Sequence, residues 1–91
     1  MPKVYNSTKP HPADAVRVDR STIFGNMFVI GIDGSREEVI DKYEQWIWQP
    51  EQVSLRLLMV HALRGKDLLC WCAPKECHAD IILGIANAKY P

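Results

Sequence analysis

The 91-residue sequence has no excess of charge of either sign and no long apolar run. Lysine plus arginine equals aspartate plus glutamate, with 11 residues in each class, so the formal net charge is zero. Because nucleic-acid-binding domains use a surplus of cations to contact phosphates, this balance disfavours nucleic acid as a partner. No stretch reaches the roughly 20 apolar residues that a membrane-spanning helix needs, so we expect no membrane association.

Several well-known functional motifs are also absent. The sequence has no Walker A motif, no Gly-x-Gly-x-x-Gly, no His-Glu-x-x-His, and neither the His-x-Glu nor the Pro-Cys-x-x-Cys of zinc deaminases. It opens with Met-Pro-Lys and no apolar segment follows, so we expect no signal peptide and a cytoplasmic location. The three cysteines, an odd number, fall within residues 70–77, which is unlike the disulfide framework of a secreted protein.

The composition is that of a soluble globular domain, with 47% hydrophobic and 24% charged residues. A chain of this length makes one domain. The order of the predicted elements indicates a small single α/β domain over residues 1–91, with a short mixed sheet and three helices. Residues 1–14, which contain Pro2, Pro10 and Pro12, are predicted to form an irregular N-terminal arm with at most a short strand at 3–6.

Further strands are predicted over residues 15–19, 27–32 and 67–72. The first alternates Val16 and Val18 with polar neighbours, which is typical of a half-buried strand. The second is a strong β run. The third is almost wholly apolar, as in strands buried on both faces, and we expect Pro74 to end it.

Three helices are predicted, the first starting at Ser35, the second over about 51–64 and the third over 77–89. Ser35 and Glu38 form a capping box, and Pro50 ends the first helix. The second helix is apolar on so many sides that we expect it to be well covered. The inner stripe of the third is expected to contain Ile81, Ile82, Ile85 and Ala88 or Lys89. We interpret Trp46 and Trp48 as core and rim residues, and His61 as a structural histidine.

The densest chemistry lies between residues 70 and 78. Strand alternation places Cys70 and Cys72 on one face, while Cys77 and His78 begin the following helix, whose N-terminal dipole favours thiolates. Three thiolates and one imidazole form an ordinary tetrahedral zinc set, so these four residues predict a zinc site. Because Cys77 and His78 are adjacent, both reach one ion only if the helix begins between or just after them.

Three other interpretations of this cluster remain open. In a variant of the metal site, Cys70 and Cys72 join either Cys77 or His78 and leave an open position. The cysteines also suit simple packing, since free cysteines are among the most buried residues. Alternatively, one of them is a reactive thiol of low pKa at the start of the helix.

A second candidate site lies in the loop between the strands predicted over residues 15–19 and 27–32. Arg20, Ser21 and Asn26 predict binding of an anion such as a phosphate, with a bidentate contact from Arg20 and close backbone approach at Gly25. The alternative is a plain connecting loop in which Asn26 adopts a left-handed turn conformation.

These motifs, taken together, resemble a family of small phage and bacterial proteins known only as a domain of unknown function. The resemblance extends over about residues 4–88. The family pattern reads Arg-x-Ser-x-x-Gly-Asn-Pro-Phe and Cys-His-Gly-Asp, and the present chain departs from it at Met27 and Ala79. The matching residues are Arg20-Ser21, Gly25-Asn26-x-Phe28, Arg36-Glu37-Glu38 and Cys70-x-Cys72-x-Pro74-x-x-Cys77-His78-x-Asp80.

The resemblance implies that one site is formed by the loop and the C-terminal motif, but it implies no reaction. Phage occurrence suggests a partner in nucleotide or nucleic-acid metabolism, or in the host cell. The residues of the implied site are Arg20, Asn26, Cys70, Cys72, Cys77, His78 and Asp80.

Three functions therefore stay open. The first is a zinc-binding domain whose metal links the last strand to the last helix. The second is a nucleotide- or phosphate-binding domain, or an enzyme, that uses Arg20 and the helix start at Cys77. The third is an interaction protein that binds a host or phage partner through its acidic helix and exposed tryptophans, with purely structural cysteines.

Overall fold

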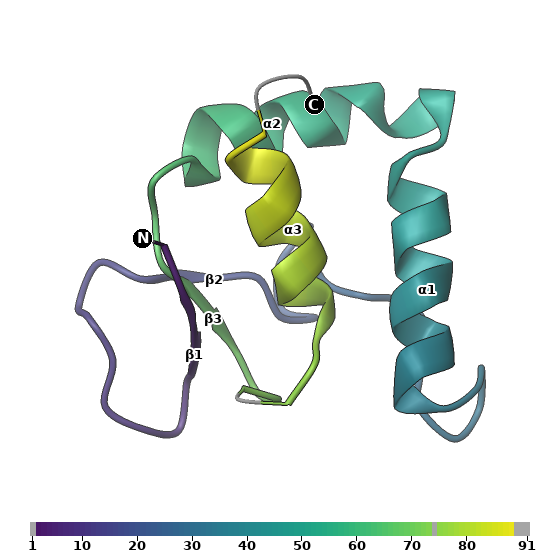
Figure 1. Ribbon diagram of the computed structural model, residues 1–91, viewed down its shortest axis with the longest axis horizontal. Coiled ribbons are helices and arrows are strands. Elements are labelled where there is room, and N and C mark those ends of the chain that lie inside the picture. The colour runs from purple at the N-terminus through teal and green to yellow at the C-terminus, as the bar shows by residue number, and fades with distance from the viewer. Residues whose placement is uncertain (1, 74, 89–91) are drawn as a thin grey trace.

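The computed structural model describes residues 2–73 and 75–88, which form three short strands and three helices (Figure 1). The α/β class and the three helices are confirmed, while the predictions made for Pro74 and Lys89 lie outside the described residues. The elements in chain order are β1 (Val4–Asn6), β2 (Val16–Arg17), α1 (Arg36–Ile47), the 3-10 turn η1 (Pro50–Gln52), α2 (Val53–Leu63), β3 (Leu68–Cys70) and α3 (His78–Ala86).

The sheet has three strands in the order β1-β3-β2, and both pairings are parallel, although a mixed sheet was expected. The parallel arrangement follows from the connections, because α1 and α2 carry the chain from β2 back to the start of β3. Leu68 pairs with Val4 on one side and with Val16 on the other. All three residues of β3 are buried, as predicted for a strand covered on both faces.

The strand predicted over residues 27–32 does not form, and this prediction was wrong. The segment is a loop with an isolated bridge between Ile30 and Gly34. Side chains take the backbone donors that a neighbouring strand would need, since Asp33 Oδ2 accepts from the Val29 N–H at 2.7 Å. Gly31 then turns the chain with a φ of 89°. Ile32 is consequently 81% exposed instead of packed in a sheet.

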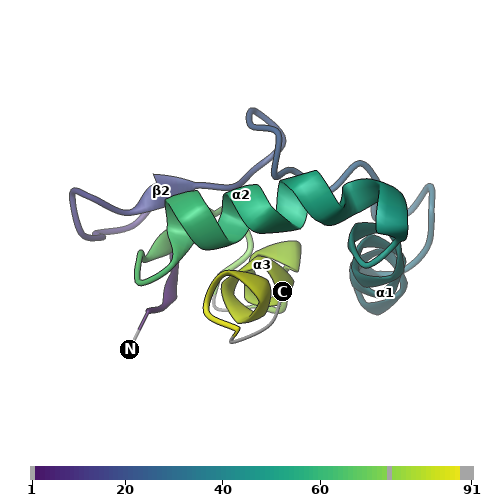
Figure 2. The same ribbon diagram turned by 90° about the horizontal axis from the view of Figure 1, so that it is seen from above.

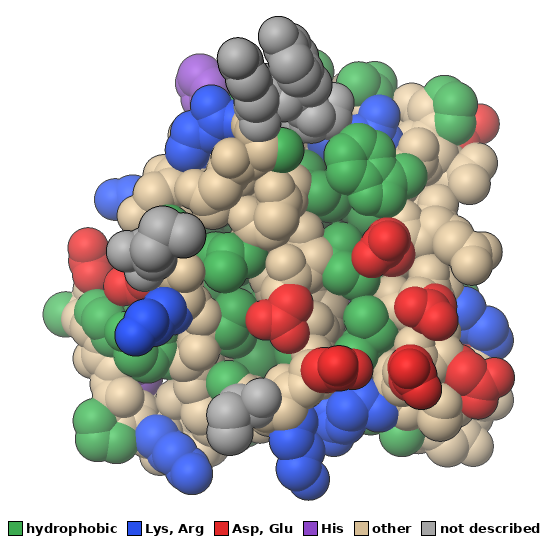
Figure 3. All heavy atoms as spheres, viewed as in Figure 1, with side chains coloured by type: hydrophobic (Ala, Val, Ile, Leu, Met, Phe, Trp, Pro, Cys, Tyr) green, Lys and Arg blue, Asp and Glu red, His purple; other side chains and the backbone are tan. Residues whose placement is uncertain are grey.

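The capping box at the start of α1 is confirmed. Ser35 Oγ accepts from the Glu38 N–H at 3.2 Å, and Glu38 Oε1 accepts from the Ser35 N–H at 3.0 Å. The helix buries Val39, Tyr43 and Ile47. Acidic side chains gather on its outer surface (Figure 3).

The expectation that α2 would be well covered was also wrong. Val53, Leu57 and Leu58 are 45%, 54% and 40% exposed. Figure 2 gives the reason, because α2 crosses over α3 and packs against it from one side only. The buried residues of this helix are Arg56, Met59 and Leu63.

Helix α3 lies between the sheet and α1, and its N-terminal end is close to the end of β3 (Figure 1). It buries His78, Ala79, Ile82, Ile85 and Ala86, whereas Ile81 is only half-buried. The inner stripe is therefore rotated from the predicted one, towards His78 at the start of the helix.

No described helix is long and apolar enough to cross a membrane.

The two tryptophans at the end of α1 lie as predicted. Trp46 is half-buried against the core, and Trp48 is 44% exposed. The Arg56 guanidinium lies 5.1 Å from the centre of a Trp48 ring. His61 is exposed in the last turn of α2.

Candidate functional site

A cavity of about 120 Å³ lies at the carboxyl ends of β2 and β3, beside the N-terminal turns of α1 and α3. Open parallel sheets place their ligands at this edge, because loops and helix N-termini converge there. The cavity is lined by the three cysteines, His78, Arg20 and Arg36, and otherwise mainly by apolar side chains of the loop and α1. The fold therefore brings the two predicted sites into one pocket.

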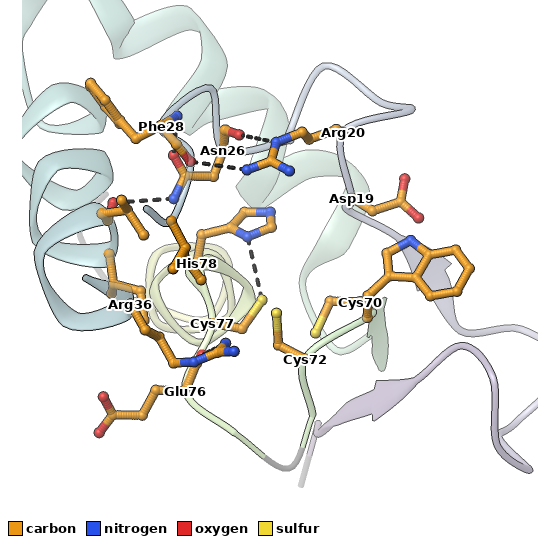
Figure 4. Close-up of a pocket in the computed structure, with 14 residues that line it drawn as sticks. Asp19, Arg20, Asn26, Phe28, Arg36, Cys70, Cys72, Glu76, Cys77 and His78 are labelled. Atoms are coloured by element: carbon orange, nitrogen blue, oxygen red, sulfur yellow. Dashed lines mark hydrogen bonds between the residues drawn. The ribbon is translucent and has the colours of Figure 1, made fainter. Parts of the chain in front are cut away.

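The three cysteines are free thiols, and their sulfur atoms point toward one another (Figure 4). Cys70 ends β3 and is buried, Cys72 follows two residues later and is half-buried, and Cys77 is buried beside α3. Both Cys70 and Cys72 line the cavity, as predicted, but strand alternation is not the reason, because β3 ends at Cys70 and Trp71 lines the same cavity.

The surroundings of Cys70 and Cys77 shift their pKa values in opposite directions. The pKa of Cys70 is lowered to about 6, mainly by its interaction with the neighbouring Cys77 side chain. The backbone N–H groups of Cys72 and Ala73 act in the same direction, against the effect of burial. The pKa of Cys77 is raised, mainly by its interaction with the Cys70 side chain and by burial of its sulfur. Of these two thiols, Cys70 is therefore the one that ionises first.

His78 is held in one orientation by contacts on both ring nitrogens. Its Nε2 lies 2.6 Å from the carbonyl oxygen of Val18, which only accepts, so Nε2 carries the proton. Burial lowers the pKa of His78, and the ring is neutral. The lone pair of Nδ1 is then directed at Cys77 Sγ, 3.3 Å away. The edge of the ring packs against Tyr43, with centroids 5.2 Å apart.

Helix α3 begins between Cys77 and His78, which meets the condition for both side chains to reach one point. Cys77 is the N-cap, in an extended conformation with φ −153° and ψ 157°, and His78 is the first helical residue. Asp80 accepts from the Cys77 N–H at 3.1 Å and so caps the helix. The Asp80 side chain does not line the cavity, although it was predicted to contact a ligand.

Arg20 reaches the cavity from the loop that follows β2. Its Nε donates to the Asn26 carbonyl at 2.8 Å, and its Nη2 donates to the Phe28 carbonyl at 3.0 Å. The loop is pinned to α1 by Asn26, whose amide donates to the Val39 carbonyl at 3.1 Å. Asn26 Oδ1 accepts from the Phe28 N–H at 2.9 Å. The Asn26 side chain thus shapes the loop, with its nitrogen and its oxygen each engaged by the backbone.

The loop conformation explains Gly25 and excludes the left-handed turn considered for Asn26. Every residue with positive φ within residues 2–73 and 75–88 is a glycine, and Gly25 is not among them. A Cβ at Gly25 would lie 2.6 Å from Arg20 Cα and 2.8 Å from the Asp19 carbonyl oxygen. The close approach at Gly25 is therefore to the chain itself and not to a ligand.

Ser21 does not line the cavity, but it organises Asp19 beside it. The Ser21 N–H and hydroxyl both donate to Asp19 Oδ1, and Arg17 Nη1 pairs with Asp19 Oδ2 at 3.1 Å. The hydrogen bond from the Ser21 hydroxyl is the main reason that the pKa of Asp19 is lowered. Ser21 thus acts on the site through Asp19.

Sequence reasoning did not assign a site role to Arg36, although this residue lines the cavity. Arg36 is the first residue of α1, and its Nη1 donates to the Glu76 carbonyl at 3.1 Å. The capping box located the start of this helix correctly. What the sequence does not show is that α1 and α3 begin at the same edge of the molecule, which brings Arg36 close to the cysteines.

The sulfur and imidazole donors are of the kind that zinc prefers, yet they are not in a metal-binding arrangement. Within the described residues, no group of three or more His, Cys, Asp or Glu side chains is placed to hold a metal ion. Cys77 and His78 come within 3.3 Å of each other, but the set as a whole is more open than a closed coordination shell.

Comparisons with known proteins identify a family but no activity. The sequence model of the domain of unknown function DUF4326 matches residues 3–88. An "Uncharacterized 12.4 kDa protein in nrdA-td intergenic region" of Enterobacteria phage T4 is 38% identical over 77 residues, which cover 82% of this chain and 69% of the phage protein. No solved structure matches the fold. The predicted resemblance to small phage proteins of unknown function is therefore confirmed.

Proposed function

The chain belongs to the DUF4326 family, and because that family has no assigned activity, we propose from the site itself that this protein is a zinc-binding domain. Cys70, Cys72, Cys77 and His78 supply the ligands. Zinc at this position joins the end of β3 to the start of α3. A domain of this size buries a modest core, so such a link adds substantially to its stability.

The observation that carries the proposal is the orientation of His78. Histidines that bind metals usually donate their second ring N–H to a carboxylate or a backbone carbonyl, which fixes the free nitrogen toward the ion. In His78 the Nε2–H is held by the Val18 carbonyl, and the free Nδ1 faces the sulfur of Cys77. The contact is made before any ion binds.

The separation of these two atoms suits a shared ion. In a tetrahedral site with Zn–S of about 2.3 Å and Zn–N of about 2.0–2.1 Å, the sulfur and nitrogen lie about 3.5 Å apart. Cys77 Sγ and His78 Nδ1 are 3.3 Å apart, so the pair needs little movement to bind. The sulfurs of Cys70 and Cys72 would complete the set by rotation of their side chains, because both already line the same cavity.

Elemental analysis tests the proposal. The protein is produced with added zinc and purified without nickel resin, and we expect about one zinc per chain. Removal by a chelator should lower the melting temperature, since a ligand bound only by the folded state stabilises it. Cobalt(II) replacing zinc should give the intense charge-transfer and visible bands of tetrahedral thiolate coordination.

Two variants separate metal binding from folding. Cys72→Ser changes a half-buried ligand by one atom and should reduce the bound zinc strongly. His61→Ala removes an exposed histidine from α2 and should leave the zinc content unchanged. A protein that carries no zinc and melts at the same temperature with and without chelator would show that the cysteines only pack.

A further inference from the structure

Two arginines face the cavity, and neither has an ion-pair partner among the described residues. Within that part of the chain, Arg20 donates to the Asn26 and Phe28 carbonyls, and Arg36 donates to the Glu76 carbonyl. The ion pair that the described residues do contain joins Arg17 to Asp19. Carbonyl acceptors orient a guanidinium but leave its full charge in place, so both cations remain available to an anion.

Both guanidinium groups also retain free donors. No described residue accepts from Nη1 of Arg20, or from Nε and Nη2 of Arg36. Each group is fixed by bonds to the backbone of a loop, which reduces the entropy that a ligand must overcome on binding. Arginine forks of this kind match the oxygen atoms of phosphates and carboxylates.

The acidic residues of the cavity wall do not cancel this charge at close range. The oxygens of the Asp19 carboxylate are already engaged by Ser21 and Arg17. Glu76 is exposed, and its carboxylate points away from the sulfur atoms, whereas the guanidinium groups of Arg20 and Arg36 flank His78 and Cys77 (Figure 4). Most of the remaining wall is apolar, which strengthens the attraction between the arginines and an anion.

We propose that this cavity binds the phosphate group of a small-molecule ligand, with Arg20 and Arg36 supplying the positive charge. The volume of about 120 Å³ is well above the roughly 10–15 Å³ that one water needs, so the cavity has room for a phosphate group. The rest of the ligand lies outward, where Trp71 is 60% exposed at the cavity wall and offers a flat surface for stacking.

The proposal goes beyond the zinc site and does not depend on it. Three thiolates around one zinc ion carry a net charge of about −1, and the two arginines would also offset that charge. If that is their whole purpose, their removal weakens zinc binding and phosphate does not bind. The two roles therefore give different results in the same set of variants.

Titration calorimetry at constant ionic strength tests the proposal, with inorganic phosphate, adenosine 5′-monophosphate and adenosine as probes. Each probe is added to the zinc-loaded and to the chelator-treated protein. Arg36→Gln and Arg20→Gln each remove one positive charge from the cavity. Lys66→Gln makes the same change in charge at the opposite end of β3, and it is the matched control. Zinc content and melting temperature are measured for every variant.

We expect saturable binding of inorganic phosphate, weakened about tenfold or more by Arg36→Gln and by Arg20→Gln, because each removes charge-assisted hydrogen bonds. Lys66→Gln should bind as the wild type does. Equal affinity for phosphate and the nucleotide indicates that phosphate alone is recognised. Tighter binding of the nucleotide, lost in Trp71→Leu, indicates a ring-bearing ester.

Three results would overturn the proposal. The first is the absence of saturable binding of both phosphate-containing probes by the wild type. The second is unchanged phosphate affinity in a folded Arg36→Gln protein, and the third is an equal loss of affinity in Lys66→Gln. Either of the last two would mean that the charge of the cavity is not what attracts the anion. Because Arg20 also braces its loop, Arg36→Gln is the decisive variant if Arg20→Gln fails to fold.

Discussion

Replacing Gly25 by alanine tests the loop that carries Arg20. The added Cβ would lie 2.6 Å from Arg20 Cα and 2.8 Å from the Asp19 carbonyl oxygen, whereas ordinary van der Waals contacts begin at 3.4 Å. Both neighbours are backbone atoms, so neither can turn aside as a flexible side chain would. The methyl group fits only if the two arms of the loop move apart, which stretches the contacts made by Asn26 and Arg20.

The expected loss follows from overpacking. Forcing one extra carbon into a well-packed site costs about 1–3 kcal/mol. The reduced freedom of alanine in the unfolded chain returns about 0.4–1 kcal/mol where the native conformation suits it. We therefore expect a net destabilisation of about 1–2 kcal/mol, which lowers the melting temperature by roughly 4–8 °C for each kcal/mol in a domain of this size.

Gly84→Ala is the matched control, and it should have the opposite effect. Gly84 lies within α3, and a Cβ there meets no atom within 4 Å. Alanine in a helix interior is favoured over glycine by about 0.8–1.0 kcal/mol, so this variant should melt at a higher temperature. Thermal and urea unfolding, followed by circular dichroism, measure both. A Gly25→Ala protein as stable as the wild type would refute the loop geometry on which the position of Arg20 depends.

Three other changes test different parts of the structure. Arg56→Met removes the donor to the Ile47 and Gln49 carbonyls, which accept at 2.7 and 2.9 Å. The loss of these charge-assisted hydrogen bonds should lower the free energy of unfolding, measured in urea, by about 1–3 kcal/mol. A decrease below about 0.5 kcal/mol would contradict this role of Arg56. Ser35→Ala removes the α1 cap and should cost about 1 kcal/mol, while Ser54→Ala on exposed α2 should cost nothing. In chelator-treated protein, the lowered pKa of His78 means that the unfolded state takes up its proton first as the pH falls. The free energy of unfolding should therefore decline below about pH 6.5, by at most about 1.4 kcal/mol per pH unit. The His78→Gln protein should lack this decline. An equal decline in both proteins would show that other groups cause it.

The parts of the fold that could be predicted are those determined by local chemistry. The Ser35 and Glu38 side chains cap α1 within one turn, and the apolar run around Leu68 forms the buried central strand. Residues 27–32 have equally strong β propensity, yet they form no strand. Their conformation depends on Asp33, which accepts a hydrogen bond from the Val29 N–H, and on the absence of a neighbouring strand among the described residues. A local sequence pattern does not show whether a strand has a neighbour to pair with.

The candidate site shows the same division between local and distant information. That Cys70 and Cys72 share a cavity with Cys77 and His78 could be predicted, although the strand alternation used to predict it does not apply, because β3 ends at Cys70 and Trp71 lines the same cavity. The backbone carbonyl that fixes His78 belongs to Val18, sixty positions earlier in the chain, and only the parallel pairing of β2 with β3 brings it there. Arg36 enters the cavity for a comparable reason, because α1 and α3 start at one edge of the molecule.

The dependence of His78 on Val18 links the two halves of the site physically. Arg20 stands two residues after Val18, so any shift of the chain that follows β2 moves the acceptor of the histidine and the phosphate-facing guanidinium together. A metal on Nδ1 would hold the histidine ring, and the Nε2–H would in turn hold the Val18 carbonyl in place. Zinc bound at the cysteines should therefore order the loop that bears Arg20. Phosphate affinity that is higher in the zinc-loaded protein than in the stripped protein is the expected sign of this coupling, and equal affinities would show that the loop is held by Asn26 alone.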